Sequence, residues 1–359
     1  MVGENMIKEG IAKLVENRNL TYEESCEIMR EIMCGKAASA QIAAFLTALR
    51  MKGETVEEIT AFTKTMKKFC HKINPKIGSR LVDTCGTGGD KIKTFNISTT
   101  AAFIAAGAGV LVAKHGNRSV TSKSGSADVL ERLGLNLNIS AQKVEESIKK
   151  IGIGFMFAPA FHPAMKYAVN PRKEIGIRTV FNILGPLTNP ANTNAQVVGV
   201  YDVQLLEKII YSLKNLGLEE AMVVSGLDGL DEISTIGKTR IAWLRNGEIK
   251  IFETAPKDFN VKKTNPEEIK GVNPEENAEI TFKILHGCLK KGDPKRDIAV
   301  VNAAAAIIIG GKAEDFSYAI ELAEESIENG SAYRKLKNLI KMYDGSNLAV
   351  LEGLELRYG

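Results

Sequence analysis

The stretch LVDTCGTGGDKIKTFNIST, residues 81–99, decides the fold of this chain. An apolar run ends at Asp83, glycine occupies three of the next six positions, and an alanine-rich segment that reads as a helix begins near Ser98. Glycine permits positive φ and lacks the β-carbon that would hold a ligand away, so successive amides can face one anion. The start of a helix adds free amide donors and the positive end of its dipole. A strand, a glycine-rich turn and a helix in this order predict an α/β fold with a seat for phosphate.

The glycine-rich turn differs from both common nucleotide-binding motifs. A dinucleotide-binding turn reads GxGxxG, and a Walker loop closes with GK followed by Ser or Thr, whereas this stretch contains neither pattern. Asp90 follows the glycines directly. A carboxylate beside phosphates indicates a sugar diol or a metal ion nearby, as a sugar phosphate would present. A tight turn that binds nothing is the alternative for this stretch taken alone.

The chain divides into an N-terminal helical part and a longer α/β part. Up to about residue 72, apolar side chains recur every three or four positions, and Thr21 with Glu24 and Thr55 with Glu58 form helix start signals. Beyond that point, short β-rich runs precede glycines and alternate with helical segments, which predicts a mostly parallel sheet. We expect an α/β protein in which a small N-terminal helical domain packs on a larger α/β domain whose central sheet is flanked by helices. The helical domain is expected at residues 1–72, joined by part of 165–190, the larger domain at 73–359, and the strands at 80–83, 110–113, 154–157, 196–200 and 221–224.

Two segments depart from this alternation. Residues 236–252 read as a β-hairpin that turns at Asn246-Gly247. Residues 170–191 hold three prolines and several basic residues between two strand-like runs. The second segment is either a hinge or a return of the chain to the helical domain, and the sequence leaves both open.

Charge and composition argue against several classes of protein. The 359 residues include 47 Lys and Arg against 43 Asp and Glu, a net charge of +4 that is too even to make nucleic acid the expected partner. The most apolar stretches, 101–113 and 298–311, are shorter than the roughly 20 residues that span a bilayer, and the N-terminus lacks the apolar segment of a secretory signal. Five scattered cysteines without a CxxC pair argue against a disulfide framework or a zinc site. We therefore expect a cytoplasmic protein with no membrane or nucleic-acid partner.

A second polar loop, KHGNRSVTSKSGSADVLERLG at residues 114–134, follows another apolar run. Lys114, Arg118 and Lys123 supply positive charge, five hydroxyls and two glycines lie among them, and Ser126 reads as the N-cap of the next helix. Such a loop taken alone is more often a solvated surface. Because two anion-binding loops follow two strands, the pair predicts a ligand with phosphate at both ends.

An acidic loop, GLDGLDEIS at residues 226–234, places Asp228, Asp231 and Glu232 within five positions. Neighbouring carboxylates repel one another unless a cation lies between them. Mg²⁺ prefers such oxygen ligands and shares its coordination shell with water and substrate phosphate. The loop therefore predicts a magnesium site, with an acidic turn that faces water as the alternative.

Six motifs occur together in one order: GTGGD, NIST, the whole loop at 114–134, HPAMK, RTVFNILGPLTNPA and GLDGLDE. In these motifs the chain resembles the anthranilate phosphoribosyltransferases of tryptophan biosynthesis, from the N-terminal helices to about Tyr343. The resemblance implies a small helical domain against a large α/β domain, as in pyrimidine nucleoside phosphorylases. It implies transfer of phosphoribosyl from phosphoribosyl diphosphate to the amine of anthranilate, with release of pyrophosphate. It further implies a need for Mg²⁺, with two ions per subunit, and a homodimer formed through the helical domain.

The same resemblance assigns roles to individual residues and implies no covalent nucleophile. The residues that it places against phosphoribosyl diphosphate are Gly86, Gly89, Asp90, Thr94, Asn96, Ile97, Ser98, Thr99, Lys114, His115, Gly116, Asn117, Arg118, Ser119, Val120, Thr121, Ser122 and Ser126. Those that it places around anthranilate are Gly86, His115, Asn117, His162 and Arg172, with Gly185 and Pro186 near the mouth of the pocket. Those that match its Mg²⁺ positions are Ser98, Asp231 and Glu232.

The chain departs from the family pattern at two positions. Thr121 stands where serine is usual, which keeps the hydroxyl, and Pro171 directly precedes Arg172, where a proline two residues before the arginine is expected. Two other functions stay open at this point. One is a nucleoside phosphorylase of the same fold, whose loops would have to recognise a base. The other is a non-catalytic binder of nucleic acid or another polyanion, which the Asp231 and Glu232 carboxylates disfavour because they repel a phosphate backbone.

Overall fold

The predicted strands form a seven-stranded sheet in the computed structural model, which describes residues 6–119 and 124–359. The order across the sheet is β3-β2-β1-β4-β5-β6-β7, and the first five of these strands run parallel while β6 and β7 are antiparallel. The β6–β7 hairpin turns at Asn246 and Gly247, whose φ angles of 53° and 77° are those of the predicted Asn-Gly turn. The strands are β1 (Leu81–Gly86), β2 (Leu111–Gly116), β3 (Ile153–Phe157), β4 (Ala195–Gly199), β5 (Glu220–Gly226), β6 (Thr239–Arg245) and β7 (Glu248–Thr254).

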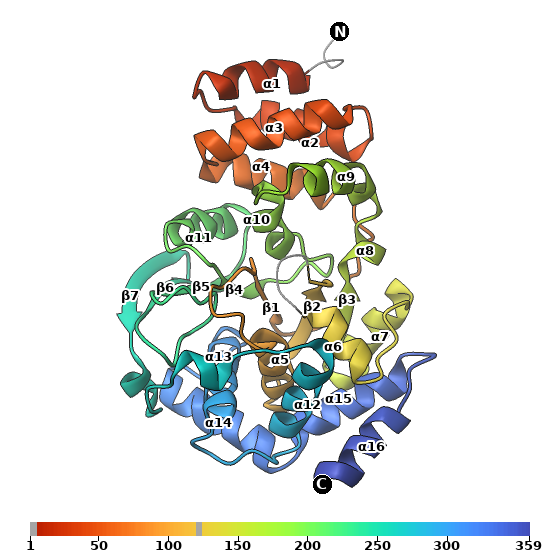
Figure 1. The fold of residues 1–359 in the computed structure, drawn as a ribbon, viewed down its shortest axis with the longest axis vertical. Coiled ribbons are helices and arrows are strands. Elements are labelled where there is room, and N and C mark those ends of the chain that lie inside the picture. Colours follow the sequence, from red (N-terminus) through yellow and green to blue (C-terminus); the bar gives the residue numbers. More distant parts are fainter. Residues whose placement is uncertain (1–5, 120–123) are drawn as a thin grey trace.

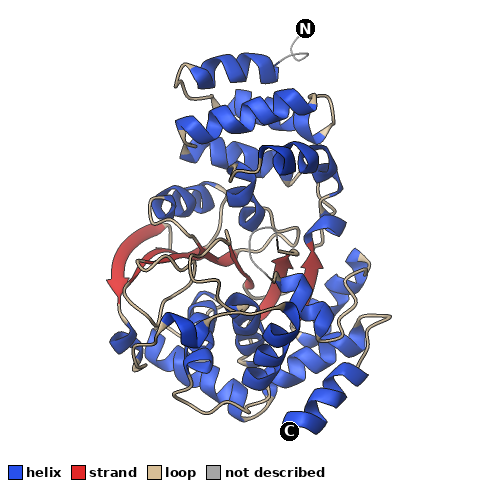
Figure 2. Ribbon diagram, in the orientation of Figure 1, coloured by secondary structure: helices blue, strands red, loops and turns tan. Residues whose placement is uncertain are grey.

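Helices flank this sheet and also form a separate bundle at the N-terminal end of the molecule (Figures 1 and 2). The α-helices are α1 (Met6–Val15), α2 (Tyr22–Met33), α3 (Ser39–Lys52), α4 (Val56–Met66), α5 (Ile97–Gly107), α6 (Ser126–Arg132), α7 (Ala141–Ile151), α8 (Ala158–Phe161), α9 (Lys166–Ile175), α10 (Val180–Leu187), α11 (Leu205–Asn215), α12 (Pro274–Leu285), α13 (Pro294–Ile309), α14 (Phe316–Glu328), α15 (Ser331–Met342) and α16 (Ala349–Tyr358). Three short 3-10 helices are η1 (Pro163–Met165), η2 (Pro256–Phe259) and η3 (Pro266–Ile269). A small N-terminal helical domain thus stands beside a larger α/β domain with a mostly parallel sheet, as the sequence predicts.

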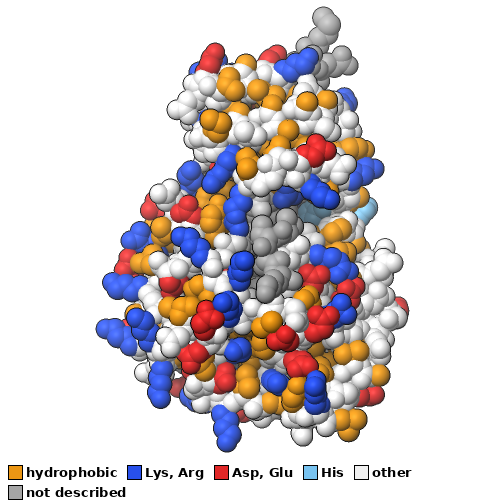
Figure 3. All heavy atoms as spheres, viewed as in Figure 1, with side chains coloured by type: hydrophobic (Ala, Val, Ile, Leu, Met, Phe, Trp, Pro, Cys, Tyr) orange, Lys and Arg blue, Asp and Glu red, His pale blue; other side chains and the backbone are white. Residues whose placement is uncertain are grey.

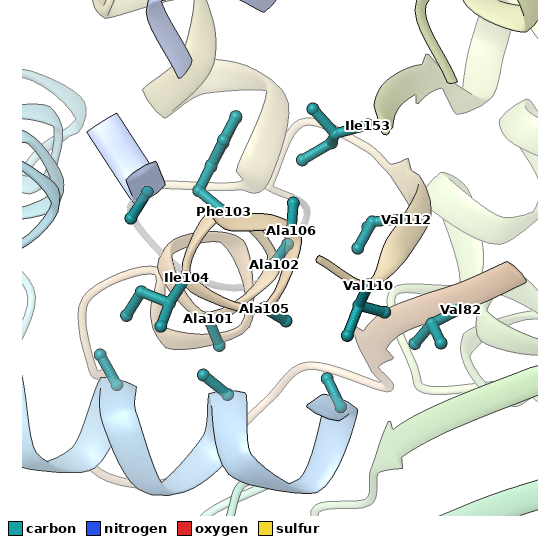
Figure 4. Close-up of a cluster of buried hydrophobic side chains, with 14 of the residues drawn as sticks. Val82, Ala101, Ala102, Phe103, Ile104, Ala105, Ala106, Val110, Val112 and Ile153 are labelled. Atoms are coloured by element: carbon teal, nitrogen blue, oxygen red, sulfur yellow. The ribbon is translucent and has the colours of Figure 1, made fainter. Parts of the chain in front are cut away.

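Helix α5, which starts directly behind the glycine-rich turn, lies at the centre of the larger core. It contacts α13, α14 and α15 and packs beside β1 and β2. Figure 4 shows its alanines, with Val82, Val110 and Val112 from the sheet side around it. Small alanine side chains let neighbouring helices and strands approach closely. The first turn of α5 is tied to β1 by a hydrogen bond from the Thr84 hydroxyl to the Ser98 carbonyl oxygen at 3.1 Å.

The bundle of α1 to α4 is extended by α9 and α10, which contact α2, α3 and α4. Thr21 and Thr55 are N-caps that accept hydrogen bonds from the Glu24 and Glu58 amides, both at 3.2 Å, as predicted. Residues 170–191 therefore return to the helices. The apolar core of the bundle includes α10 and continues into side chains of one sheet face, among them Val198 and Val223.

One predicted helix start is wrong. The N-cap of α6 is Gly125, and Ser126 is already the first helical residue. The Asp128 carboxylate accepts a hydrogen bond from the Gly125 amide at 2.9 Å, which leaves the Ser126 hydroxyl facing the Asn117 carbonyl oxygen at 3.4 Å. A carboxylate three residues into the helix thus performs the capping that the sequence predicts for the serine.

The face drawn in Figure 3 carries both basic and acidic side chains and is not dominated by charge of one sign. Basic and acidic side chains are interspersed over the larger domain there, in keeping with the small net charge of +4. Within the described parts of the chain, none of the helices is long and apolar enough to cross a membrane. All five cysteines are free thiols.

Candidate active site

Loops from the carboxyl ends of three strands meet at one cleft. Strands β1, β2 and β5 are parallel, so the loops that follow them leave the sheet at the same edge. In the sheet, β2 and β3 lie on one side of β1, and β4 and β5 lie on its other side, so the strand order reverses direction at β1. In open α/β sheets ligands bind outside the strand ends at such a switch point. Helices α9 and α10 close the cleft from the side of the bundle, and its volume is about 300 Å³.

Most of the predicted site residues line this cleft. They are Gly86, Asn96, Ser98, Thr99, Lys114, His115, Gly116, Asn117, Arg118, Ser119, Ser126, Arg172, Asp231 and Glu232, and Gly185 and Pro186 line it as well. Gly89, Asp90, Thr94, Ile97 and His162 are not among the lining residues. Val120, Thr121 and Ser122 lie outside the described residues. The three loops nevertheless converge as the sequence analysis requires.

Three of the residues that do not line the cleft, Asp90, Thr94 and Ile97, shape the loop after β1 or anchor it in the core. The side chain of Ile97 is 1% exposed and belongs to the core beneath α5, so only its backbone is placed at the helix start. The Asp90 carboxylate accepts a hydrogen bond from the Thr94 amide at 2.9 Å, and Thr94 in turn forms a β-bridge with Lys270. Asp90 thus folds back on its own loop and shapes the turn.

The glycine-rich turn and the acidic loop are in direct contact. The Asp231 carboxylate accepts a hydrogen bond from the Gly88 amide at 2.9 Å. A β-carbon at Gly86 would lie 2.6 Å from Asp231 Oδ2, and one at Gly199 would lie 1.6 Å from the Asp231 carbonyl oxygen. Glycine is therefore required at the ends of β1 and β4 because the acidic loop crosses directly over them.

Asp231 and Glu232 form a half-buried acidic pair. Burial, and then the nearby charge of Asp90, raise the pKa of Asp231 to about 6. Burial, and then the neighbouring Asp231, raise the pKa of Glu232 well above its usual range. Each carboxylate is costly to ionise without a cation between them.

The pair suits a hard divalent cation. Across residues 6–119 and 124–359 no group of three or more His, Cys, Asp or Glu side chains could hold a metal ion by itself. Mg²⁺ commonly binds through one or two carboxylates together with water and substrate phosphates. Asp231 and Glu232, with the Ser98 hydroxyl in the same cleft, fit an ion whose shell the ligand completes.

Lys114 is a buried cation at the base of the cleft, with 2% of its surface exposed. Its ammonium donates to the Thr84 carbonyl oxygen and lies 3.5 Å from Ser98 Oγ. Burial lowers the pKa of Lys114, while the charge of Asp83 opposes that shift. The lysine is thus held at the first turn of α5, where an anion would also meet the free amides of that helix.

Arg118 lines the cleft and also forms ion pairs within its own loop region. Its guanidinium forms ion pairs with Asp128 at 3.0 Å and Glu131 at 2.8 Å. The same Asp128 accepts hydrogen bonds from the Ser119 and Gly125 amides, at 3.0 Å and 2.9 Å. The charge of Arg118 is therefore already balanced, and its side chain ties the loop after β2 to α6.

Arg172 supplies an unbalanced positive charge on the helical side of the cleft. It is half-buried and stacks over the Phe181 ring at 5.2 Å from the centroid, and burial lowers its pKa. In the described part of the chain the Arg172 guanidinium has no ion pair. A planar guanidinium of this kind binds a carboxylate through two parallel hydrogen bonds.

His115 and His162 lie against each other, with ring centroids 5.1 Å apart. Burial, and then the neighbouring His162, lower the pKa of His115 to about 3, and burial lowers the pKa of His162 to about 4. Both imidazoles are therefore neutral near pH 7. His115 lines the cleft and His162 packs behind it.

Several residues of the cleft were missed by sequence reasoning. Phe181 and Asn182 of α10 line it, whereas Ser124 and Gly125, which also line it, belong to the predicted polar loop at 114–134. Arg178, between α9 and α10, donates a hydrogen bond from Nη1 to the Gly88 carbonyl oxygen at 3.1 Å. The motif RTVFNILGPL contains three of these residues, so its polar side chains beside apolar ones were the available signal.

Comparison with known proteins first defines the class. Residues 8–70 match the family model "Glycosyl transferase family, helical bundle domain", and residues 78–333 match "Glycosyl transferase family, a/b domain". A helical bundle that closes a cleft at the edge of an α/β sheet is thus the architecture of this glycosyltransferase family.

Individual relatives define the family more narrowly. The anthranilate phosphoribosyltransferase of Acetivibrio thermocellus is 52% identical over 94% of this chain and 96% of its own length. The crystal structure of the Thermus thermophilus enzyme matches with a TM-score of 0.86 and 37% identity, covering 96% of this chain and 99% of that one. The Saccharomyces cerevisiae enzyme in complex with PRPP and Mg matches with a TM-score of 0.83 and 30% identity, covering 94% and 97%. The chain belongs to the anthranilate phosphoribosyltransferase family.

Proposed function

We propose that this protein transfers the 5-phosphoribosyl group from phosphoribosyl diphosphate to the amine of anthranilate, with release of pyrophosphate, in the biosynthesis of L-tryptophan. The observation that carries the proposal is the meeting, in one cleft, of two polar loops, an acidic pair and an arginine that has no ion pair among the described residues. The loops suit the phosphates, the acidic pair suits Mg²⁺, and the arginine suits an acceptor that carries a carboxylate.

The donor end of the cleft is formed by the α/β domain. The first turn of α5 offers backbone amides beside the glycine-rich turn, and Lys114 adds a positive charge beneath them. The loop after β2 adds Asn117 and Ser119, held in place by Asp128. These groups support assignment of the two ends of phosphoribosyl diphosphate to the loops after β1 and β2.

The acceptor end is formed by α9 and α10. Arg172 binds the anthranilate carboxylate in this proposal, with Asn117 and the neutral His115 across the cleft. His162 then acts behind His115 by packing against its ring. Pro171 sits inside α9 directly before Arg172, and the helix accommodates it without moving Arg172 away from the cleft.

The reaction requires alignment more than proton transfer. An arylamine is neutral near pH 7, so its lone pair can attack C1 of the ribose while the bond from C1 to pyrophosphate breaks. The amine then loses one proton to water or to the released pyrophosphate. Holding two reactants in line can contribute on the order of 7 kcal/mol or more to such a step. The reaction therefore needs no nucleophile paired to a base.

Asp231, Glu232 and Ser98 are the residues proposed to hold Mg²⁺, with two ions per subunit. When bound, Mg²⁺ neutralises charge that develops on the diphosphate leaving group. The acidic loop positions its carboxylates for this purpose through the Gly88 amide and the glycine at the end of β4.

The remaining expectations are proposals of the same kind. We place the domain division near residue 72, in the gap between the two matched stretches at 8–70 and 78–333. We also propose a cytoplasmic enzyme that forms a homodimer through the helical domain. Exposed apolar side chains on that domain support the dimer, including Val15 at 69% and Met51 at 84% exposure. Sedimentation analysis of the whole protein tests it.

The decisive experiment follows anthranilate fluorescence after addition of phosphoribosyl diphosphate and Mg²⁺. We expect the signal to fall only when donor and metal are both present, and pyrophosphate to appear in equal amount. Phosphorolysis of uridine or thymidine, measured in parallel, tests a nucleoside phosphorylase. Turnover of a nucleoside without consumption of anthranilate would overturn the proposal, as would binding of DNA with no turnover of either.

A further inference from the structure

Arg178 lies between α9 and α10, yet its side chain reaches the glycine-rich turn of the other domain. Its Nη1 donates a hydrogen bond to the Gly88 carbonyl oxygen at 3.1 Å. A β-carbon added at Gly89 would lie only 1.1 Å from Nη2. The guanidinium therefore rests directly on the backbone of Gly88 and Gly89.

The other face of the arginine is covered by Tyr201, which follows β4. The guanidinium carbon lies 4.0 Å from the centroid of the Tyr201 ring, a close stacking distance for a cation on an aromatic face. The Tyr201 amide donates a hydrogen bond to Thr87 Oγ1 at 3.3 Å. Tyr201 thus contacts the same turn from its backbone and supports the arginine with its ring.

The two glycines beneath Arg178 have φ angles of 64° and 89°. Glycine reaches such values at little steric cost but also leaves them easily, because it has many accessible conformations. A turn that has to present its amides in one direction therefore needs an external restraint. Along the described chain Arg178 has no ion pair with a carboxylate, so its position is set by the turn and by Tyr201.

We propose that Arg178 is a positioning residue, which clamps the Gly88-Gly89 turn against Tyr201 so that the turn is ordered for the donor phosphates before the donor binds. This inference rests on the proposed function and deepens it. Because Arg178 belongs to the segment that joins α9 to α10, the clamp also links the acceptor side of the cleft to the donor loop.

The clamp is tested by titrating phosphoribosyl diphosphate with Mg²⁺ into the whole protein by calorimetry. Loss of a charge-assisted hydrogen bond predicts that Arg178→Ala weakens donor binding about ten- to a hundredfold. Arg178→Lys recovers little of this, because an ammonium cannot both stack on the ring and bond the turn. Tyr201→Leu weakens donor binding about threefold or more, whereas Tyr201→Phe keeps the ring and the affinity of the original protein.

Two further measurements distinguish a positioning role of Arg178 from direct binding of the donor. In steady-state assays Arg178→Ala raises the KM for the donor while the KM for anthranilate changes less than about twofold. In the ligand-free protein, amide hydrogen exchange at residues 86–93 becomes faster in Arg178→Ala and Tyr201→Leu. Lys173→Ala, which removes an exposed cation of α9, is the matched control and leaves all three measurements unchanged.

The outcomes distinguish the clamp from the function on which it rests. If the original protein does not bind the donor, the proposed function fails. If it binds the donor, but Arg178→Lys binds equally well and Tyr201→Leu has no effect, Arg178 acts as a charge for the ligand and the clamp is overturned. Unchanged exchange at residues 86–93 in Arg178→Ala overturns it as well.

Discussion

Asp231 and Glu232 are adjacent carboxylates whose raised pKa values record the cost of keeping two negative charges together in a half-buried cleft. We predict that Asp231→Asn combined with Glu232→Gln lowers Mg²⁺-dependent turnover by about a thousandfold. The melting temperature stays the same or rises, because charge repulsion is removed while side-chain shape is kept. Anthranilate fluorescence at a series of Mg²⁺ concentrations measures the first effect, and thermal unfolding measures the second.

The control for this double variant removes two carboxylates elsewhere. Glu207→Gln with Glu321→Gln changes two exposed side chains outside the cleft. It should retain full turnover. Full activity in the Asp231 and Glu232 variant would rule out the metal assignment.

His162 makes stability depend on pH. Its pKa of about 4 in the folded protein lies below the roughly 6.5 of an exposed histidine, so the unfolded chain binds the proton more readily. Stability contributed by the neutral ring is therefore complete at pH 7 and is lost as the pH falls from about 6.5 towards 4. At pH 5 the loss from this group is about 2 kcal/mol.

We predict that His162→Gln loses less stability than the original protein between pH 7 and pH 5. Thermal unfolding of both proteins at the two pH values measures the difference. The variant is expected to be less stable at pH 7, where the ring packs against His115 without charge. An equal fall in melting temperature for both proteins would contradict the assigned pKa.

Single residues also mark the limit of sequence reasoning. The placement of Arg118 against the donor stays a prediction, and its pairing with Asp128 and Glu131 was not foreseen because that pairing depends on where α6 begins. The role of Arg178 could not be predicted for a related reason. Its partner Gly88 is 90 residues away along the chain, and no periodicity or spacing reports such a contact.

At the level of elements, local rules are enough for most of the fold. The five parallel strands begin and end close to the predicted runs, and the Asn246-Gly247 turn forms the predicted hairpin, because each depends on neighbouring residues. The three loops of the cleft were also predictable, since parallel strands end at one edge of a sheet. The start of α6 was not, because Gly125 and Ser126 compete for the cap and Asp128 decides between them.

The end of strand β4 allows a test of how closely the acidic loop packs against the sheet. A β-carbon at Gly199 would lie 1.6 Å from the Asp231 carbonyl oxygen, so backbone has to move to admit it. We predict that Gly199→Ala displaces the acidic loop and lowers turnover by at least about a hundredfold, with a lower melting temperature. Gly353→Ala in α16 has no atom within 4 Å of the new carbon, and it should keep activity and gain slightly in stability. Normal turnover in Gly199→Ala would show that the loop is not held as described.

For the whole molecule, the helical bundle and the sheet are not separable bodies. Their side chains share one apolar core, which includes residues of α10 and α11 and of strands β4 and β5. We predict that a fragment of residues 73–359 exposes this core and aggregates or binds a hydrophobic dye, although it keeps every strand. Soluble expression and dye fluorescence beside the full chain test this. A monomeric fragment that unfolds cooperatively would contradict it.

The cleft divides its two tasks between distant parts of the chain, since strand-end loops face the sugar phosphate and residues 166–187 face the amine in the proposed arrangement. Evolution can therefore change the acceptor-binding segment to suit another aromatic amine while the donor-binding loops stay the same. One position limits this independence of the two parts. Arg178 lies in this adaptable segment but contacts the glycine-rich turn, so a lineage that remodels the segment has to keep the arginine in place.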